Sequence, residues 1–235
     1  SLIVGIVSCV SETGPKCGAL ARQLWIADRQ RERSPARYQH IVFPIPAEFN
    51  DFCRYNPSFC YGLLFRAAWK TLDTFAKDKK WLGANAGATM VLHTWGQNLM
   101  LHPHVHAIVP SGGLDGGLDG AGNWVVPKKG HGKAGFLFPV KAMSKVFRAV
   151  FLNAFRKAWN DGALVLPPAA PTKRVEIRRG LHLRHRQAWV VYAKAPFGGP
   201  ESVIEYLGHY THKTAISNHR LLDLSGGKVT FRYKD

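Results

Sequence analysis

The chain has 235 residues, of which 46% are hydrophobic, so it can build one ordinary domain with a core, and a disordered or fibrous protein is excluded. It carries 32 Lys and Arg against 15 Asp and Glu, and a formal net charge of +17 makes a polyanionic partner the first expectation. No apolar run of about 18 residues could span a membrane. The opening "SLIVGIVSCV" lacks the features of a signal peptide, and the 4 cysteines form no dense disulfide framework, so we expect a reducing cytoplasm.

The first half of the chain alternates extended and helical patterns. Residues 1–37 are short and polar and predict a small turn and a helix near 18–33, which we interpret as an appendage or linker. The run "YQHIVFPIP" predicts a strand closed by prolines, and apolar residues at helical spacing predict a long amphipathic helix over 57–78. Two strands follow, over 87–99 and 103–110, with a short connection between them.

The second half begins with the glycine-rich segment 111–124, which predicts a turn or loop. Phe147, Phe151 and Phe155 lie four residues apart and predict an apolar stripe on a helix over 140–159. Basic strands are expected over 173–186 and 187–196, then a helix from about Val203, and finally strand-like segments around a Gly-Gly turn. The whole pattern predicts an α+β fold with a mainly antiparallel sheet flanked by helices.

The segment "HPHVH" places histidines at every second position of a predicted strand. His104 and His106 therefore point to the same face, roughly 6.6 Å apart along the backbone, and can converge on one metal ion. A hairpin centred near Met100 would set Gln97 opposite His104, which makes Gln97 the candidate third ligand. His93, His102 and, on a later helix, His212 are alternative ligands, and a solvated or hydrogen-bonded histidine pair is the competing interpretation. Nitrogen and amide-oxygen ligands with open positions suit a catalytic divalent ion better than a closed structural zinc site.

The segment "IEYLGHYTHK" carries Tyr206 and Tyr210 at spacing four, so both phenols lie on one face of the predicted helix. Half-buried packing is the ordinary role of such a pair. A histidine strand followed about a hundred residues later by this helix, in a strongly basic chain, resembles the HUH endonucleases.

More narrowly, "LHTWGQNLMLHPHVHAIVPSGGL", "YLGHYTHKTAISNHRLL" and "VTFRYKD" resemble the two-tyrosine rolling-circle transposases of bacterial insertion sequences, the insertion-sequence-ninety-one family. The resemblance implies that His104, His106 and a third polar ligand hold Mg²⁺ or Mn²⁺. It also implies that Tyr206 and Tyr210 attack DNA, leaving a 5′-phosphotyrosine and a free 3′-OH. The implied location is the bacterial cytoplasm, at the nucleoid.

The resemblance further implies a partner: single-stranded or hairpin DNA at the ends of the element. Such DNA needs a positive groove and stacking platforms for splayed bases. Trp189 and Tyr192 could supply the platforms, although any single basic residue can equally be a solvated surface charge. The candidate DNA-binding residues are Arg174, Arg178, Arg179, Arg184, Arg186, Lys213 and Arg220.

The chain departs from the family pattern at both ends. Family members carry a cysteine-rich zinc module before the catalytic domain, but "CVSETGPKC" retains only Cys9 and Cys17 of its end, and two thiolates cannot close a tetrahedral zinc site. We therefore expect no N-terminal zinc, a degenerate module with a linker helix over 1–37, and an HUH-like catalytic domain over 38–235. The chain also stops where family members continue, which is expected of a fragment or a decayed copy.

Three functions remain open at this point. The first is a metal-dependent transposase domain that nicks and rejoins single-stranded DNA. The second is a basic DNA-binding remnant without turnover, and the third is a metal phosphoesterase that uses water while the tyrosines only pack. A covalent protein–DNA adduct is expected from the first alone.

Overall fold

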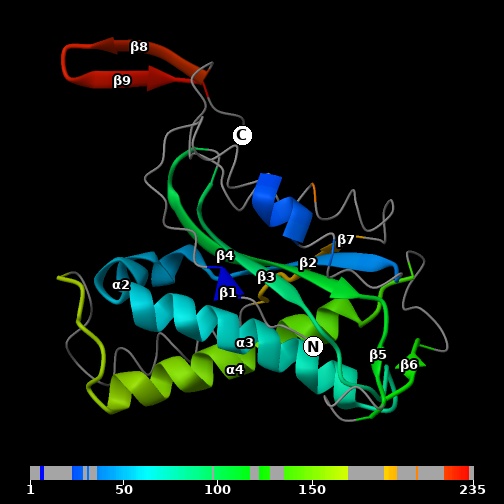
Figure 1. Cartoon of the computed structure of the whole chain (residues 1–235). Coiled ribbons are helices and arrows are strands. Elements are labelled where there is room, and N and C mark those ends of the chain that lie inside the picture. Colours follow the sequence, from blue (N-terminus) through cyan, green and yellow to red (C-terminus); the bar gives the residue numbers. More distant parts are fainter. Residues whose placement is uncertain are drawn as a thin grey trace.

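A computed structural model describes residues 6–7, 23–28, 31, 36–96, 98–116, 122–127, 135–168, 188–194, 205 and 220–232 (Figure 1). The helical elements are η1 (Ala47–Phe49), α2 (Asn50–Tyr55), α3 (Pro57–Lys77) and α4 (Val140–Asn160). The strands are β1 (Ile6–Val7), β2 (Tyr38–Pro44), β3 (Thr89–Trp95), β4 (Leu101–Pro110), β5 (Gly113–Leu114), β6 (Trp124–Val125), β7 (Tyr192–Lys194), β8 (Leu221–Ser225) and β9 (Lys228–Phe231).

The centre of the fold is a five-stranded sheet with the strand order β1-β3-β4-β2-β7. Every neighbouring pair in it is antiparallel except β1 and β3, which run parallel. β4 lies in the middle, so the histidine strand is held on both sides by backbone hydrogen bonds. The prediction of an α+β fold with a mainly antiparallel sheet carrying this strand is confirmed.

One face of the sheet packs on α3 and α4, which lie side by side beneath it (Figure 1). Strand alternation explains this arrangement: Ile41, Phe43, Val105 and Ala107 are fully buried on the helical side, whereas His104 and His106 point to the opposite face. The histidines therefore lie on the face that the two long helices leave uncovered.

α4 supplies much of the core, as its four-residue phenylalanine spacing predicts. Phe147, Phe151 and Phe155 are at most 1% exposed. Phe49, from η1, packs edge-on against Phe151 and Phe155 with ring centroids 5.3 and 5.1 Å away. These contacts hold the helical layer rigidly under β4 and β2.

The structure adds elements that the sequence pattern did not predict. η1 and α2 lie between the first long strand and α3, with Cys53 of α2 and Cys60 of α3 buried as free thiols. The segment 111–124, expected as a turn or loop, also contributes to a small β-ribbon that was not predicted, in which Gly113–Leu114 pairs with Trp124–Val125. Glycine is found in strands at positions where another backbone segment approaches closely, so a glycine-rich segment can form a short strand there.

Other expected elements are found in whole or in part. Residues 23–28 are helical within the expected 18–33 helix, and β7 lies within the expected strand 187–196. β8 and β9 form a hairpin that projects away from the sheet, and Gly226 and Gly227 make its turn with φ angles of 56° and 71° (Figure 1). The expected strand 173–186 and most of the helix from Val203 lie outside the described residues.

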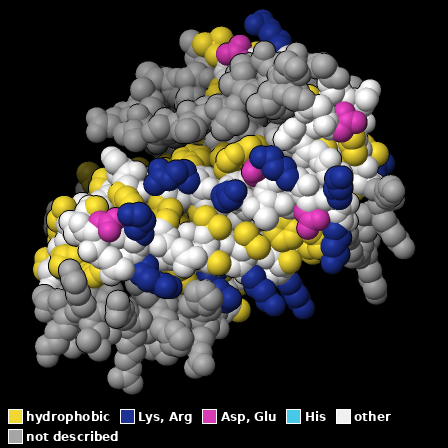
Figure 2. Space-filling model, turned by 90° about the horizontal axis from the view of Figure 1, so that it is seen from below, with side chains coloured by type: hydrophobic (Ala, Val, Ile, Leu, Met, Phe, Trp, Pro, Cys, Tyr) yellow, Lys and Arg dark blue, Asp and Glu magenta, His cyan; other side chains and the backbone are white. Residues whose placement is uncertain are grey.

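Basic side chains lie on the helical layer, on the side of the sheet away from the histidines. Figure 2 shows Lys and Arg side chains spread across the helical layer with few acidic groups among them. The exposed basic residues of α3 and α4 are Arg66, Lys70, Lys77, Lys141, Lys145 and Lys157. Within the described residues, no helix is both long enough and apolar enough to cross a membrane.

Candidate metal centre

The register of β3 and β4 sets the geometry of the site. His93 pairs with His104, and Trp95 pairs with Leu101. Between these pairs, His102 and Pro103 together lie opposite the single residue Thr94. This two-to-one arrangement is a β-bulge in β4. The carbonyl of Pro103 accepts a hydrogen bond from the N–H of Ile45, just beyond β2, at 3.3 Å, and such an irregular position is where a proline fits inside a sheet.

The expected hairpin centre near Met100 is therefore wrong. The turn is centred on Asn98 and is closed by a hydrogen bond from the Gly96 N–H to the Met100 carbonyl at 2.9 Å. It follows that His93, and not Gln97, lies opposite His104. Gln97 itself is outside the described residues.

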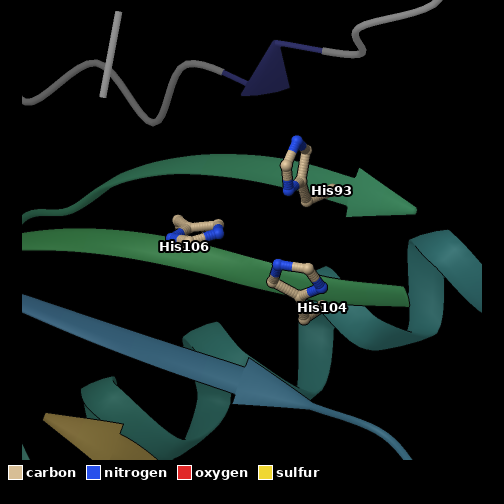
Figure 3. Close-up of side chains that lie close together, drawn as sticks. All are labelled: His93, His104 and His106. Atoms are coloured by element: carbon tan, nitrogen blue, oxygen red, sulfur yellow. The ribbon is translucent and has the colours of Figure 1, made fainter. Parts of the chain in front are cut away.

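His93, His104 and His106 form one group on the face of the sheet opposite α3 and α4 (Figure 3). Their candidate ligand nitrogens all lie within 4.8 Å of one another. The ring centroids of His104 and His106 are 4.8 Å apart, and that of His93 is 5.1 Å from His104 and 5.6 Å from His106. His93 and His106 are buried and His104 is half-buried, so the group is largely screened from bulk water.

Two of the three rings are oriented by a hydrogen bond through Nδ1. His104 Nδ1 donates to the carbonyl oxygen of His102 at 2.6 Å. His106 Nδ1 is 2.7 Å from Nε2 of His40, a buried residue of β2. In both rings the Nδ1 atom is engaged, so Nε2 is the atom that can bind a cation.

The surroundings hold these rings neutral at physiological pH. Burial lowers the pKa of His104 to about 4, and the hydrogen bond to the His102 backbone offsets only part of that effect. Burial first, and then the charges of the neighbouring histidines and Lys194, lower the pKa of His106 to about 2. Burial, followed by the charges of Lys194 and His104, lowers the pKa of His40 to about 4. A neutral imidazole is the form that binds a metal ion.

The donor set fits a divalent metal ion. Three imidazoles suit first-row transition ions such as Zn²⁺, Fe²⁺ or Ni²⁺ better than Mg²⁺, which prefers oxygen ligands. Protein ligands from two strands leave positions open for a substrate.

The neighbouring strands add groups that sequence reasoning missed or misplaced. His40 was not singled out, because a histidine among apolar residues of a strand gives no sign of what lies across the sheet. Tyr192 shares the histidine face, since it pairs with Val42, which pairs with His106; it is 58% exposed. Trp189 is only 5% exposed and packs against Phe147 in the core, so the expectation that it is a stacking platform is wrong.

Most of the other predicted site residues lie outside the described residues, including Tyr206 and Tyr210. Arg220 is described and lies at the base of the β8–β9 hairpin, where its Nε donates to the Arg232 carbonyl at 2.7 Å. Its predicted contact with DNA stays a prediction. The remaining predicted residues outside the described part are Arg174, Arg178, Arg179, Arg184, Arg186 and Lys213.

A family model described as "Putative transposase" (Y2_Tnp) matches residues 87–235, a segment that contains β3, β4 and both tyrosines of the predicted helix. The chain belongs to this transposase family.

Two curated relatives are also named transposases. "Putative transposase y4qJ" of Sinorhizobium fredii is 44% identical over 97% of this chain and 56% of its own length. "Transposase for insertion sequence element IS801" of Pseudomonas savastanoi pv. phaseolicola is 27% identical over 97% of this chain and 52% of its own length. The chain thus spans about half the length of these relatives.

Among solved structures, the conjugative relaxase TrwC in complex with OriT DNA, in a metal-free form, is 13% identical with a TM-score of 0.38 over 74% of this chain and 72% of that chain. A metal-bound form of the same relaxase complex has a TM-score of 0.28 at 12% identity, over 74% of this chain and 70% of that chain.

Proposed function

We propose that this chain is a transposase catalytic domain that nicks and rejoins single-stranded DNA through a 5′-phosphotyrosine, with a divalent metal ion, for rolling-circle transposition. The observation that carries the proposal is that His93, His104 and His106 lie together on the face of the sheet opposite α3 and α4. Membership of the transposase family over the segment that also contains Tyr206 and Tyr210 supports it.

The histidine group would hold the cation through nitrogen atoms. Because all three donors are imidazoles, we infer a divalent first-row transition ion; Mn²⁺ belongs to that series and, like Mg²⁺, also accepts the oxygen ligands of a phosphate. When bound, such an ion supplies Lewis-acid chemistry that draws charge from the oxygens of the scissile phosphate. The hydrogen bonds at Nδ1 of His104 and His106 hold the rings ready, so little rearrangement is needed when the ion and the DNA arrive.

The covalent step is assigned to Tyr206 and Tyr210. The phenolic oxygen of one tyrosine forms a bond to the scissile phosphorus, while the bond from phosphorus to the 3′-oxygen breaks. The phenolic proton is lost and the departing 3′-oxygen gains a proton, so the products are a 5′-phosphotyrosine and a 3′-OH. The bond energy is retained in the phosphotyrosine, and rejoining therefore needs no nucleotide. The second tyrosine can cut a second strand while the first holds its product.

The partner in this proposal is single-stranded or hairpin DNA lying across the histidine face. Tyr192 is exposed on this face and offers a ring on which a base can stack. Lys194 pairs with His40 and is exposed beside it, where it can contact a phosphate. The net charge of +17 supports binding to a polyanion, and the predicted arginines of 174–186 would extend the contact.

The proposal is tested by incubating the chain with labelled single-stranded DNA libraries and Mn²⁺, followed by a denaturing gel. Label that migrates with the denatured protein supports it when the label is lost in His104→Ala and in the Tyr206→Phe/Tyr210→Phe double variant. Cleavage without attached label would instead indicate a water-using phosphoesterase. Binding without cleavage on any library would indicate a DNA-binding remnant.

A further inference from the structure

His40 of β2 touches a candidate metal ligand from the neighbouring strand. Its Nε2 lies 2.7 Å from Nδ1 of His106, and the two rings stack with centroids 5.0 Å apart and an angle of 6° between their planes. His40 is 1% exposed and His106 is 5% exposed. His40 is not within the group formed by His93, His104 and His106, and its hydrogen bond reaches the site through the candidate ligand His106.

The register of the sheet explains why these two rings meet. His106 pairs with Val42, and His40 pairs with Ile108, so His40 and His106 are diagonal neighbours on the same face. Diagonal positions across two strands are within reach of rings of this size. β2 and β4 are joined by continuous pairing from Tyr38 to Pro44, which makes the contact a fixed property of the sheet.

A hydrogen bond between two neutral imidazoles fixes the tautomer of both, because one nitrogen must donate and the other must accept. If Nδ1 of His106 donates to Nε2 of His40, the lone pair of His106 is on Nε2, where it can bind a cation. If the bond ran the other way, Nε2 of His106 would carry the proton and could not be a ligand. Metal-binding histidines ordinarily donate their second nitrogen to such an acceptor.

We propose that His40 is a positioning residue: it accepts a hydrogen bond from Nδ1 of His106 and thereby holds His106 in the tautomer and orientation that bind the metal ion. This role rests on the proposed metal site. The usual acceptor behind a metal-bound histidine is a carboxylate or a carbonyl. A neutral imidazole completes the contact here without adding negative charge beside the DNA phosphate.

The tautomer can be read directly in the metal-free wild-type chain. Long-range ¹⁵N–¹H correlation spectra of protein labelled with ¹⁵N-histidine, at pH 7.5, distinguish a protonated Nδ1 from a protonated Nε2. A His106→Asn variant assigns the signal by its disappearance. The expected result is that Nδ1 of His106 carries the proton and Nε2 of His106 is unprotonated. A proton on Nε2 of His106 would overturn the assignment, and no metal or activity is needed for this measurement.

The second measurement is the affinity for Mn²⁺, by isothermal titration calorimetry, of wild type, His40→Leu and His40→Gln. Leucine removes the acceptor, whereas glutamine keeps a side-chain oxygen that can accept from Nδ1. We expect His40→Leu to weaken Mn²⁺ binding by about 10- to 100-fold and His40→Gln to recover most of that loss. Far-UV circular dichroism and the melting temperature of the metal-free proteins show whether each variant is folded.

The outcomes separate this role from the metal site itself. If His104→Ala abolishes binding but a folded His40→Leu binds Mn²⁺ as wild type does, only the role of His40 is overturned. If leucine and glutamine weaken binding equally at equal stability, His40 is a packing residue and the positioning role is again overturned. If wild type binds no divalent ion, the metal site fails and the role of His40 fails with it.

Discussion

His93 and His104 face each other directly across β3 and β4, with their ring centroids 5.1 Å apart and nearly perpendicular at 83°. The bulge at His102 and Pro103 sets this pairing. A slip of one residue would turn His93 to the opposite side of the sheet, into the apolar core. The three-histidine site is therefore a consequence of the strand register as much as of the "HPHVH" pattern.

The first prediction concerns the third ligand. His93→Ala should weaken Mn²⁺ binding by at least about 100-fold, because it removes one of three nitrogen donors. Gln97→Ala should leave the affinity within about threefold of wild type if His93 completes the set. His102→Ala is the matched control: the histidine beside the site is replaced, but the carbonyl that orients His104 is kept. Titration calorimetry measures all three, and a large effect of Gln97→Ala with none from His93→Ala would restore Gln97 as the ligand.

The second prediction concerns acid stability. His40, His104 and His106 have pKa values lowered from 6.5 to about 4, 4 and 2. Below pH 6.5 the unfolded chain binds protons that the folded chain does not, so the free energy of unfolding falls as the pH drops, by up to about 1.4 kcal/mol per pH unit for each histidine. Above about pH 7 these three histidines should no longer change the free energy of unfolding with pH.

Urea denaturation with EDTA between pH 7.5 and 5 measures this dependence. In His106→Leu the free energy of unfolding should fall less steeply with decreasing pH, by about 1 kcal/mol per pH unit, because one buried neutral ring is gone. An unchanged slope in that variant would show that these histidines do not govern the acid sensitivity.

The third prediction concerns the histidine face as the DNA surface. Tyr192→Ala should weaken binding of a short single-stranded oligonucleotide by about 1–3 kcal/mol, because a base would lose its stacking partner. Tyr55→Ala is the matched control, since Tyr55 is 46% exposed at the end of α2 and away from this face. Fluorescence anisotropy at fixed salt compares them, and equal losses in the two variants would place the DNA elsewhere.

The fourth prediction contrasts two glycines. A Cβ at Gly113 would overlap the backbone carbonyl oxygen of Asn85, so Gly113→Ala should destabilise the fold by about 1–3 kcal/mol as the backbone shifts. A Cβ at Gly62 of α3 meets only the flexible end of Arg66 at 3.1 Å, so Gly62→Ala should stabilise by about 0.5–1 kcal/mol. Urea denaturation measures both, and stabilisation by Gly113→Ala would contradict the close approach.

Periodic patterns predicted the framework well. The apolar stripe of Phe147, Phe151 and Phe155 places α4 over Val140–Asn160, within one residue of expectation, and the histidine alternation places His104 and His106 on one face. These features depend only on local geometry, which repeats every 3.6 residues in a helix and every 2 in a strand. They can therefore be predicted from the sequence alone.

Features that depend on contacts between distant segments were not predicted. The turn is centred near Asn98 and not near Met100, so His93 and not Gln97 lies opposite His104, and the bulge at His102 and Pro103 shifts the register by one residue. Trp189 and Tyr192 look equally suited to stacking in sequence, yet one is buried against α4 and the other is exposed. The contact between His40 and His106 depends on the pairing of β2 with β4, which the sequence pattern did not predict.

The most direct test of the account is to locate the covalent bond to DNA. The chain is incubated with a cleavable single-stranded substrate and Mn²⁺ and digested with a protease and a nuclease, and the peptides are analysed by mass spectrometry. We predict a nucleotide 5′-phosphate attached to Tyr206 or Tyr210, which moves to the remaining tyrosine in each single Phe variant and disappears in His104→Ala. Cleaved DNA with no modified tyrosine, or an adduct that persists in His104→Ala, would contradict the proposed chemistry.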